Sequence, residues 1–158
     1  MENIVFIIFC FFTILPLTTL CHELGHFFVT RLFFIENVTV RIGSGKEMFR
    51  LKVKDLTVVL HIFPYGGTTF FELNKNLSSM KQIILSLGGP LLNGCIAFFL
   101  LLPGLGSGDH YITIWFQWLA LFNLWMCVMN LIPYKIGLFY SDGWVIVKVI
   151  SENLRSNV

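Results

Sequence analysis

The motif His22-Glu23-Leu24-Gly25-His26 places three ionisable side chains within five residues. On a helix, positions four apart lie about 40° from each other around the axis, so both imidazoles can bind one metal ion. Glu23 lies beside that face, where it can take a proton from a water molecule that the metal activates. The motif therefore predicts the site of a zinc hydrolase, with His22 and His26 as ligands and Glu23 as general base.

The same spacing also arises by chance in soluble proteins, where the side chains only pack. Here the motif belongs to an apolar run that extends from Asn3 to Phe34. Ionisable groups are costly in such a segment and are usually functional there, so packing explains the motif poorly. Cys21 is a further candidate ligand, but on a helix it points about 100° away from His22.

The composition indicates an integral membrane protein of one domain, residues 1–158. The chain is 56% hydrophobic and only 13% charged, with a mean hydropathy of +0.77. Soluble domains are closer to about a quarter charged. The four cysteines lie in apolar segments without C-x-x-C spacing, so they predict no disulfide framework. We expect a lipid bilayer around the protein and no nucleic-acid partner.

The apolar segments predict the fold class: an all-α polytopic membrane protein with three core transmembrane helices, a C-terminal helix and a small membrane-associated β-sheet. The expected ranges are 3–34, 80–105 and 111–132 for the transmembrane helices, 36–72 for the β region and 142–155 for the C-terminal helix.

Within the β region, Val38–Ile42 and Phe49–Val53 alternate apolar and polar residues on either side of the turn Gly43–Lys46. This pattern predicts a β-hairpin. A third extended run, Leu56–Phe63, ends in Pro64-Tyr65-Gly66-Gly67. His61 in that run is better explained as a surface or interfacial histidine than as a ligand.

Basic residues predict the orientation in the membrane. All eleven Lys and Arg lie between Arg31 and Lys81 or between Lys135 and Arg155. With three crossings, the positive-inside rule places the amino terminus outside a cell membrane and the carboxyl terminus, the sheet and the metal site on its cytoplasmic side. The amino terminus has no basic region or small-residue cleavage site, so we expect the first helix to be retained.

Catalytic zinc usually has three protein ligands and an open fourth position, so the two histidines need a partner. Asp142 is the best candidate, because it lies between the third transmembrane helix and the last helix. Asp109 and Glu152 fall in the outer turn and in the terminal tail. Alternatively, Asp142 is only a helix N-cap, for which Ser141-Asp142-Gly143 is well suited.

The second transmembrane segment contains Gly88–Gly94, whose small residues allow close approach of a neighbouring helix. Pro90 frees a backbone carbonyl within it. Asn93 either makes an interhelical hydrogen bond or binds the backbone of a substrate, and geometry alone favours the interhelical bond.

Three motifs together resemble the site-2 protease family of intramembrane zinc metalloproteases, over nearly the whole chain. They are His22–His26, Gly89–Asn93, and Asn130-Leu131-Ile132-Pro133 followed by Asp142-Gly143. The resemblance implies zinc binding by His22, His26 and Asp142, general-base catalysis by Glu23, binding of the scissile carbonyl or its oxyanion by Asn130, and substrate binding by Asn93, Gly66 and Gly67. The segment that ends in the two glycines is similar to the family's sheet, whose edge adds a substrate strand.

The chain departs from the family pattern after Pro133. Eight residues, Tyr134–Ser141, separate this proline from Asp142, whereas the family usually has four. The chain also shows no PDZ or nucleotide-binding domain. We expect a nearly minimal catalytic core, gated by a regulatory membrane partner, self-association, the substrate or the lipid.

The sequence therefore predicts a zinc-dependent intramembrane endopeptidase, with a membrane-embedded peptide or protein as substrate. The resemblance allows three kinds of substrate: a membrane-tethered regulator, a small peptide precursor or a leftover signal peptide. The composition is compatible with a bacterium of low genomic GC content. The alternatives are a catalytically inactive membrane binding or immunity protein that captures a hydrophobic peptide, and a metal transporter. The intact Glu23 argues against the binding protein, and a single carboxylate-containing site argues against the transporter.

Overall fold

The computed structural model describes residues 2–70, 77–102, 110–137 and 139–156. Within these ranges the elements are α1 (Glu2–Leu32), β1 (Val38–Val53), β2 (Leu56–Phe70), α2 (Ser79–Leu101), α3 (Tyr111–Leu131), β3 (Lys135–Ile136), β4 (Phe139–Tyr140) and α4 (Asp142–Ser156). The expected ends of the β region at residue 72 and of the second transmembrane helix at residue 105 lie outside the described residues.

The helices α1, α2 and α3 are long and apolar enough to cross a membrane. With 31 residues, α1 is about 46 Å long, more than the roughly 30 Å of a hydrocarbon core. Large apolar side chains remain exposed along the three helices, among them Phe12, Phe98 and Leu121. The prediction of three apolar helices of membrane-spanning length, a further helix and a small sheet is confirmed.

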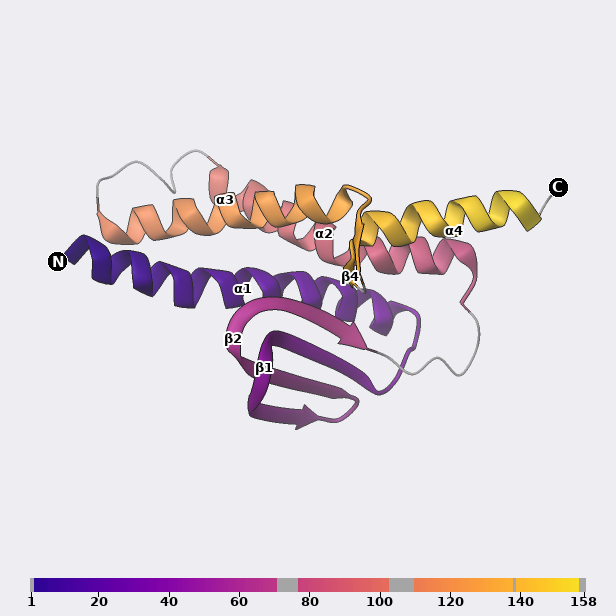
Figure 1. Ribbon diagram of the computed structural model, residues 1–158, viewed down its shortest axis with the longest axis horizontal. Coiled ribbons are helices and arrows are strands. Elements are labelled where there is room, and N and C mark those ends of the chain that lie inside the picture. Colours follow the sequence, from indigo (N-terminus) through magenta and orange to yellow (C-terminus); the bar gives the residue numbers. More distant parts are fainter. Residues whose placement is uncertain (1, 71–76, 103–109, 138, 157–158) are drawn as a thin grey trace.

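The three long helices pack side by side (Figure 1). α3 lies along the first part of α1, whereas α4 continues beyond α3 and lies along the first part of α2. Cys10, Ile14 and Leu119 form a buried apolar cluster between α1 and α3. The indole Nε1 of Trp115 donates a hydrogen bond to Thr13 Oγ1 at 2.9 Å, which fixes the two helices against each other.

The backbones of α1 and α2 are in contact at Gly25, in the middle of the motif His22–His26, and at Gly88, next to the motif Gly89–Asn93. A Cβ atom at Gly88 would lie 2.6 Å from the carbonyl oxygen of Gly25, and one at Gly25 would overlap the carbonyl of Gly88. Only residues without a side chain allow this backbone contact. It brings α2 directly against the face of α1 that carries the two histidines.

The sheet lies beside the second half of α1 (Figure 1). The apolar cluster between them consists of Ile35, just before β1, and Val38, Val40 and Ile42 of β1, which pack with Leu20 and Phe27 of α1. The alternation of apolar and polar residues in the first half of β1 therefore buries one face of the strand against the helix.

The predicted hairpin between Val38–Ile42 and Phe49–Val53 is wrong, because these two segments of β1 do not pair with each other. Both pair with the segment 56–60 of β2, the first in parallel and the second antiparallel. The tight turn is at Lys54, which has a φ of 51°, and not at Gly43–Lys46. The glycines at 43 and 45 instead bend β1, which lets the apolar run 56–60 pair on both of its edges.

The end of β2 pairs with the other edge of the first half of β1, opposite the segment 56–60. Gly67 pairs with Ile42 and Phe70 with Thr39, so residues 67–70 run antiparallel to the first half of β1. The last segment of β2 is therefore at an edge of the sheet, where Gly67 and Thr69 contact α1.

Candidate metal centre

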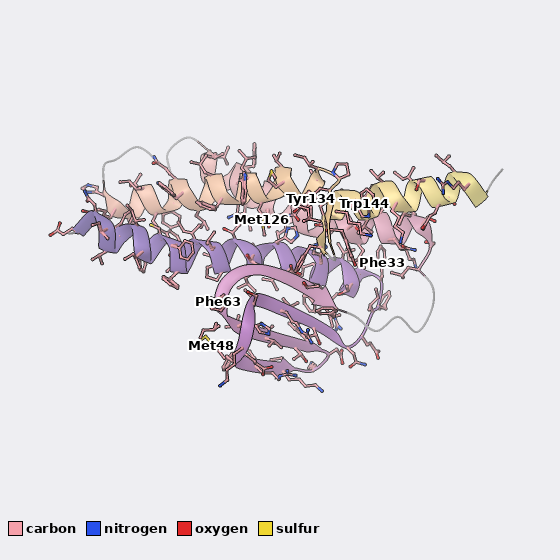
Figure 2. All side chains as sticks on the ribbon, in the orientation of Figure 1. Phe33, Met48, Phe63, Met126, Tyr134 and Trp144 are labelled. Carbon is pink, nitrogen blue, oxygen red and sulfur yellow. The ribbon has the colours of Figure 1, made fainter. Side chains whose placement is uncertain are left out.

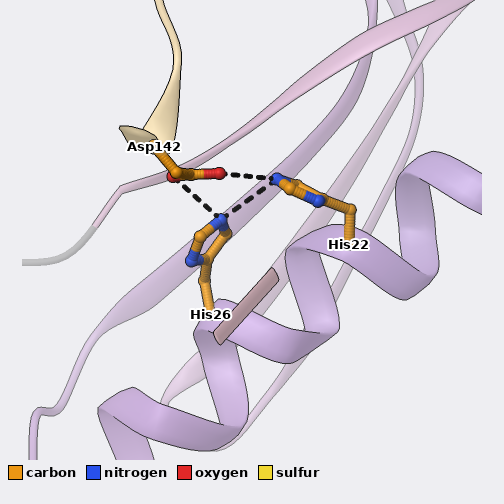
Figure 3. Close-up of side chains that lie close together, drawn as sticks. All are labelled: His22, His26 and Asp142. Atoms are coloured by element: carbon orange, nitrogen blue, oxygen red, sulfur yellow. Dashed lines mark hydrogen bonds and ion pairs between the residues drawn. The ribbon is translucent and has the colours of Figure 1, made fainter. Parts of the chain in front are cut away.

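Two imidazoles from α1 and a carboxylate from the start of α4 converge on one point (Figure 3). The Nε2 atoms of His22 and His26 lie 3.2 Å apart. His22 Nε2 lies 3.1 Å from Asp142 Oδ2, and His26 Nε2 lies 3.4 Å from Asp142 Oδ1. The three ligand atoms all lie within 4.8 Å of one another, and both histidines are buried.

A backbone carbonyl sets the orientation of the His26 ring. His26 Nδ1 lies 2.8 Å from the carbonyl oxygen of Leu85, which can only accept, so Nδ1 carries the proton. In the neutral ring, Nε2 then presents its lone pair to the centre, as a metal-binding histidine does. Pro90 lacks the N–H that would bond the carbonyl of Ser86, so the hydrogen-bond ladder of α2 is interrupted close to this contact.

The donor set fits a zinc ion. The lone pair of His26 Nε2 faces a carboxylate oxygen of Asp142, an arrangement that is unfavourable unless a positive charge lies between them. Two imidazole nitrogens and one carboxylate oxygen are a usual ligand set for catalytic zinc, which keeps its fourth position open.

The additional residues after Pro133 form a small hairpin that returns the chain to the site. β3 pairs antiparallel with β4. At the base of this hairpin, the Ser141 N–H donates to the Tyr134 carbonyl at 3.1 Å. Tyr134 and Ser141 are therefore neighbours in space, and the longer connection does not displace Asp142 from the histidines. Figure 2 shows Tyr134 and Trp144 together at this junction.

Ser141, and not Asp142, caps α4. Its Oγ accepts hydrogen bonds from the backbone N–H groups of Trp144 and Tyr134, each at 3.1 Å, and donates to the Ile132 carbonyl at 2.7 Å. The alternative role of Asp142 as N-cap is therefore wrong. Because Ser141 satisfies the helix terminus, the Asp142 side chain is free to face the histidines.

Glu23 is buried and its carboxylate is held by the sheet. Thr69 Oγ1 donates a hydrogen bond to Glu23 Oε2 at 2.5 Å. A Cβ atom at Gly67 would lie 2.7 Å from Glu23 Oε1, so the backbone of β2 passes directly beside this carboxylate. The sequence interpretation missed Thr69, although it shares one face of β2 with Gly67 two residues earlier.

Three other predicted site residues lie as follows. Gly66 has a φ of +75° and open space where a Cβ atom would lie. Asn130 donates from Nδ2 to the Met126 carbonyl of its own helix at 3.0 Å. Asn93 is fully buried, and the predicted interhelical hydrogen bond is not found among the described residues. Substrate roles for all three remain predictions.

Gly89 leaves the space that the metal centre needs. A Cβ atom there would lie 2.5 Å from His26 Nε2 and 2.8 Å from His22 Nε2. We therefore expect Gly89→Ala to lower zinc affinity by at least about 100-fold, as judged against the 10–100-fold typical of changes around the ligands. Chelator competition measures this affinity. The matched control is Gly94→Ala, whose Cβ would lie 3.2 Å from Cys127 Sγ and should leave zinc affinity unchanged. Equal affinity in Gly89→Ala and wild type would contradict the placement of the site.

An H-E-x-x-H helix joined by a carboxylate from a distant helix is the arrangement of a zinc metallopeptidase site. Residues 10–113 of the chain match Peptidase family M50. The chain therefore belongs to this family, the site-2 protease family. Asp142 lies beyond the matched residues, so its place in the site comes from the structure.

The chain is similar to two bacterial proteins that carry the name "Putative zinc metalloprotease". The one from Thermotoga maritima is 30% identical over 112 residues, which cover 61% of this chain and 22% of that protein. The one from Campylobacter jejuni is 32% identical over 94 residues, which cover 50% of this chain and 26% of that protein. The matches thus span about a quarter of the length of each relative.

Proposed function

We propose that this protein is a zinc-dependent endopeptidase that hydrolyses peptide bonds in or next to membrane-embedded segments. The observation that carries the proposal is the convergence of His22, His26 and Asp142, next to the buried Glu23, in a protein built on three apolar helices. Membership of Peptidase family M50 supports the same reaction.

Zinc in this site would supply Lewis-acid chemistry and would make water a better nucleophile near neutral pH. Glu23 accepts the proton of the attacking water and later delivers it to the leaving amine. The Thr69 hydroxyl fixes Oε2 of Glu23, which leaves Oε1 to accept the proton. Asn130, near the end of α3, is proposed to stabilise the oxyanion by donating a hydrogen bond.

The last segment of β2 is the proposed docking edge for the substrate. Residues 67–70 pair with β1 on one edge, and no other described strand pairs with their second edge. A transmembrane helix must unwind before its backbone can be cut, and an unpaired strand edge can take up the freed backbone groups. Since Gly67 touches Glu23, a substrate strand added at Gly66 and Gly67 would pass close to the general base.

The proposed surroundings follow from the apolar helices and the basic residues. The three helices would cross a cell membrane with the amino terminus outside, and the sheet and α4 would face the cytoplasm. The substrate would be a membrane-tethered regulator or a small hydrophobic peptide precursor. A regulatory membrane protein or a second copy of the chain would control access of the substrate to the site.

Cleavage of membrane-anchored peptides tests this function. The purified protein in lipid vesicles is incubated with a library of such peptides, and the products are mapped by mass spectrometry. We expect cuts within or next to the apolar segment, loss of cleavage on chelation and recovery when zinc is added back. Tight capture of peptides without any zinc-dependent cut would contradict the proposal and favour a binding or immunity protein.

A further inference from the structure

Four buried side-chain atoms have no hydrogen-bond partner among the described residues. They are His22 Nδ1, Asn93 Nδ2, Asn93 Oδ1 and Asn123 Oδ1. All belong to the apolar helices α1, α2 and α3, where no lipid group can satisfy a buried donor or acceptor. Buried polar atoms of this kind normally have a partner, so each of them points to a contact that the described protein side chains alone do not supply.

The two histidines differ in their outer ring nitrogens. His26 Nδ1 donates to the Leu85 carbonyl, whereas His22 Nδ1 is unpaired among the described residues. Metal-binding histidines almost always donate this second N–H to an acceptor, which fixes the tautomer and the ring orientation. His22 thus needs an acceptor that the surrounding backbone does not provide.

Asn93 lies where it can provide that acceptor. Gly89 touches the His22 ring, since a Cβ there would lie 2.7 Å from His22 Cε1, and Asn93 is one helical turn further along the same face of α2. α2 runs antiparallel to α1 (Figure 1), so this turn moves from the level of His22 toward that of Thr18. His22 Nδ1 and the Asn93 amide therefore belong to the same α1–α2 interface.

We propose that Asn93 positions His22 through one buried water molecule. The His22 Nδ1–H donates to the water, and the water donates to Asn93 Oδ1, as buried waters commonly join polar groups that do not meet directly. The bridge holds the lone pair of Nε2 toward the metal, which gives His22 the support that Leu85 gives His26. This inference rests on the proposed zinc site and assigns Asn93 a positioning role before any substrate binds.

The burial of Asn93 distinguishes a positioning role from the predicted contact with substrate. Asn93 is 0% exposed in the structure, so a peptide could touch it only if α2 moved away from its neighbours. A positioning residue affects zinc affinity in the absence of substrate, whereas a residue that only binds substrate affects cleavage alone. Zinc affinity of the substrate-free protein is therefore the deciding quantity.

The test uses the matched pair Asn93→Val and Asn93→Thr, which have nearly the same shape but differ in one hydroxyl group. We expect Asn93→Val to lower zinc affinity about 10–100-fold and Asn93→Thr to restore most of it, because the hydroxyl can accept from the water. Competition with a chelator measures the zinc affinities of both variants in lipid vesicles without substrate. Asn93→Ala and Asn93→Ser repeat the comparison if the first pair does not fold.

Equal zinc affinity in the hydroxyl-bearing and apolar variants would overturn the inference, whether both equal wild type or both are weakened. Unchanged zinc affinity with reduced cleavage would also overturn it and would assign Asn93 to the substrate. Failure of the wild-type protein to bind zinc would instead contradict the proposed function itself, so the two failures are distinguishable.

Discussion

Replacing Glu23 by glutamine is expected to reduce the rate of peptide cleavage by about 10²–10⁴-fold while the protein keeps its zinc. Glutamine preserves the size of the side chain and can still bond Thr69, but it cannot accept the proton of the attacking water. The ligands His22, His26 and Asp142 are unchanged. Turnover of an anchored peptide and zinc content, measured on the same samples, check both parts of this result.

The control for this experiment is Glu36→Gln, the same change at an exposed residue between α1 and β1. It should cleave as wild type does. Undiminished cleavage in Glu23→Gln would remove Glu23 from the mechanism. Loss of zinc in this variant would instead mean that Glu23 helps to hold the metal, contrary to the assignment of Asp142 as third ligand.

Asp142→Asn is expected to lower zinc affinity by at least about 100-fold and to abolish cleavage at limiting zinc, since a lost ligand should cost more than the 10–100-fold of an outer-shell change. The substitution removes the negative charge that faces both imidazoles at 3.1 and 3.4 Å. Ser141 would still cap α4, so the helix should remain in place. Chelator competition and circular dichroism measure zinc affinity and helix content.

The matched control is Asp55→Asn. Asp55, in the turn between β1 and β2, pairs with Arg31 of α1 at 3.2 Å at the solvent-exposed surface, where such pairs contribute little to stability. Wild-type zinc affinity in Asp142→Asn would show that the two histidines act with a different third ligand, and the proposed geometry of the site would be wrong.

Local patterns in the sequence were sufficient to predict the helices and the two histidines of the site. Long apolar runs predict membrane-spanning helices, and positions four apart place His22 and His26 on one face without knowledge of the rest of the fold. Asp142 could be proposed as the third ligand from its position in the chain. Residues 135–140 were compatible with a turn that returns Asp142 to the histidines, but their local pattern does not determine the β3–β4 pairing that achieves it.

Long-range pairing accounts for what the sequence did not predict. Alternation in Val38–Ile42 and Phe49–Val53 identifies strands but not their partners, and the segment 56–60 separates the two in the sheet. Thr69 could not be recognised as the partner of Glu23, because 46 residues separate them. That the Asn93 amide has no hydrogen-bond partner among the described residues likewise follows only from the packing of the helices.

X-ray absorption spectroscopy at the zinc edge, on vesicle-reconstituted protein that cleaves its substrate, tests the central claim most directly. The account predicts about one zinc per chain, bound by nitrogen and oxygen donors at about 2.0–2.2 Å, with imidazole scattering from two histidines. A protein that cleaves without zinc would contradict the account, as would a sulfur donor at about 2.3 Å, which would indicate a cysteine such as Cys21 in place of Asp142.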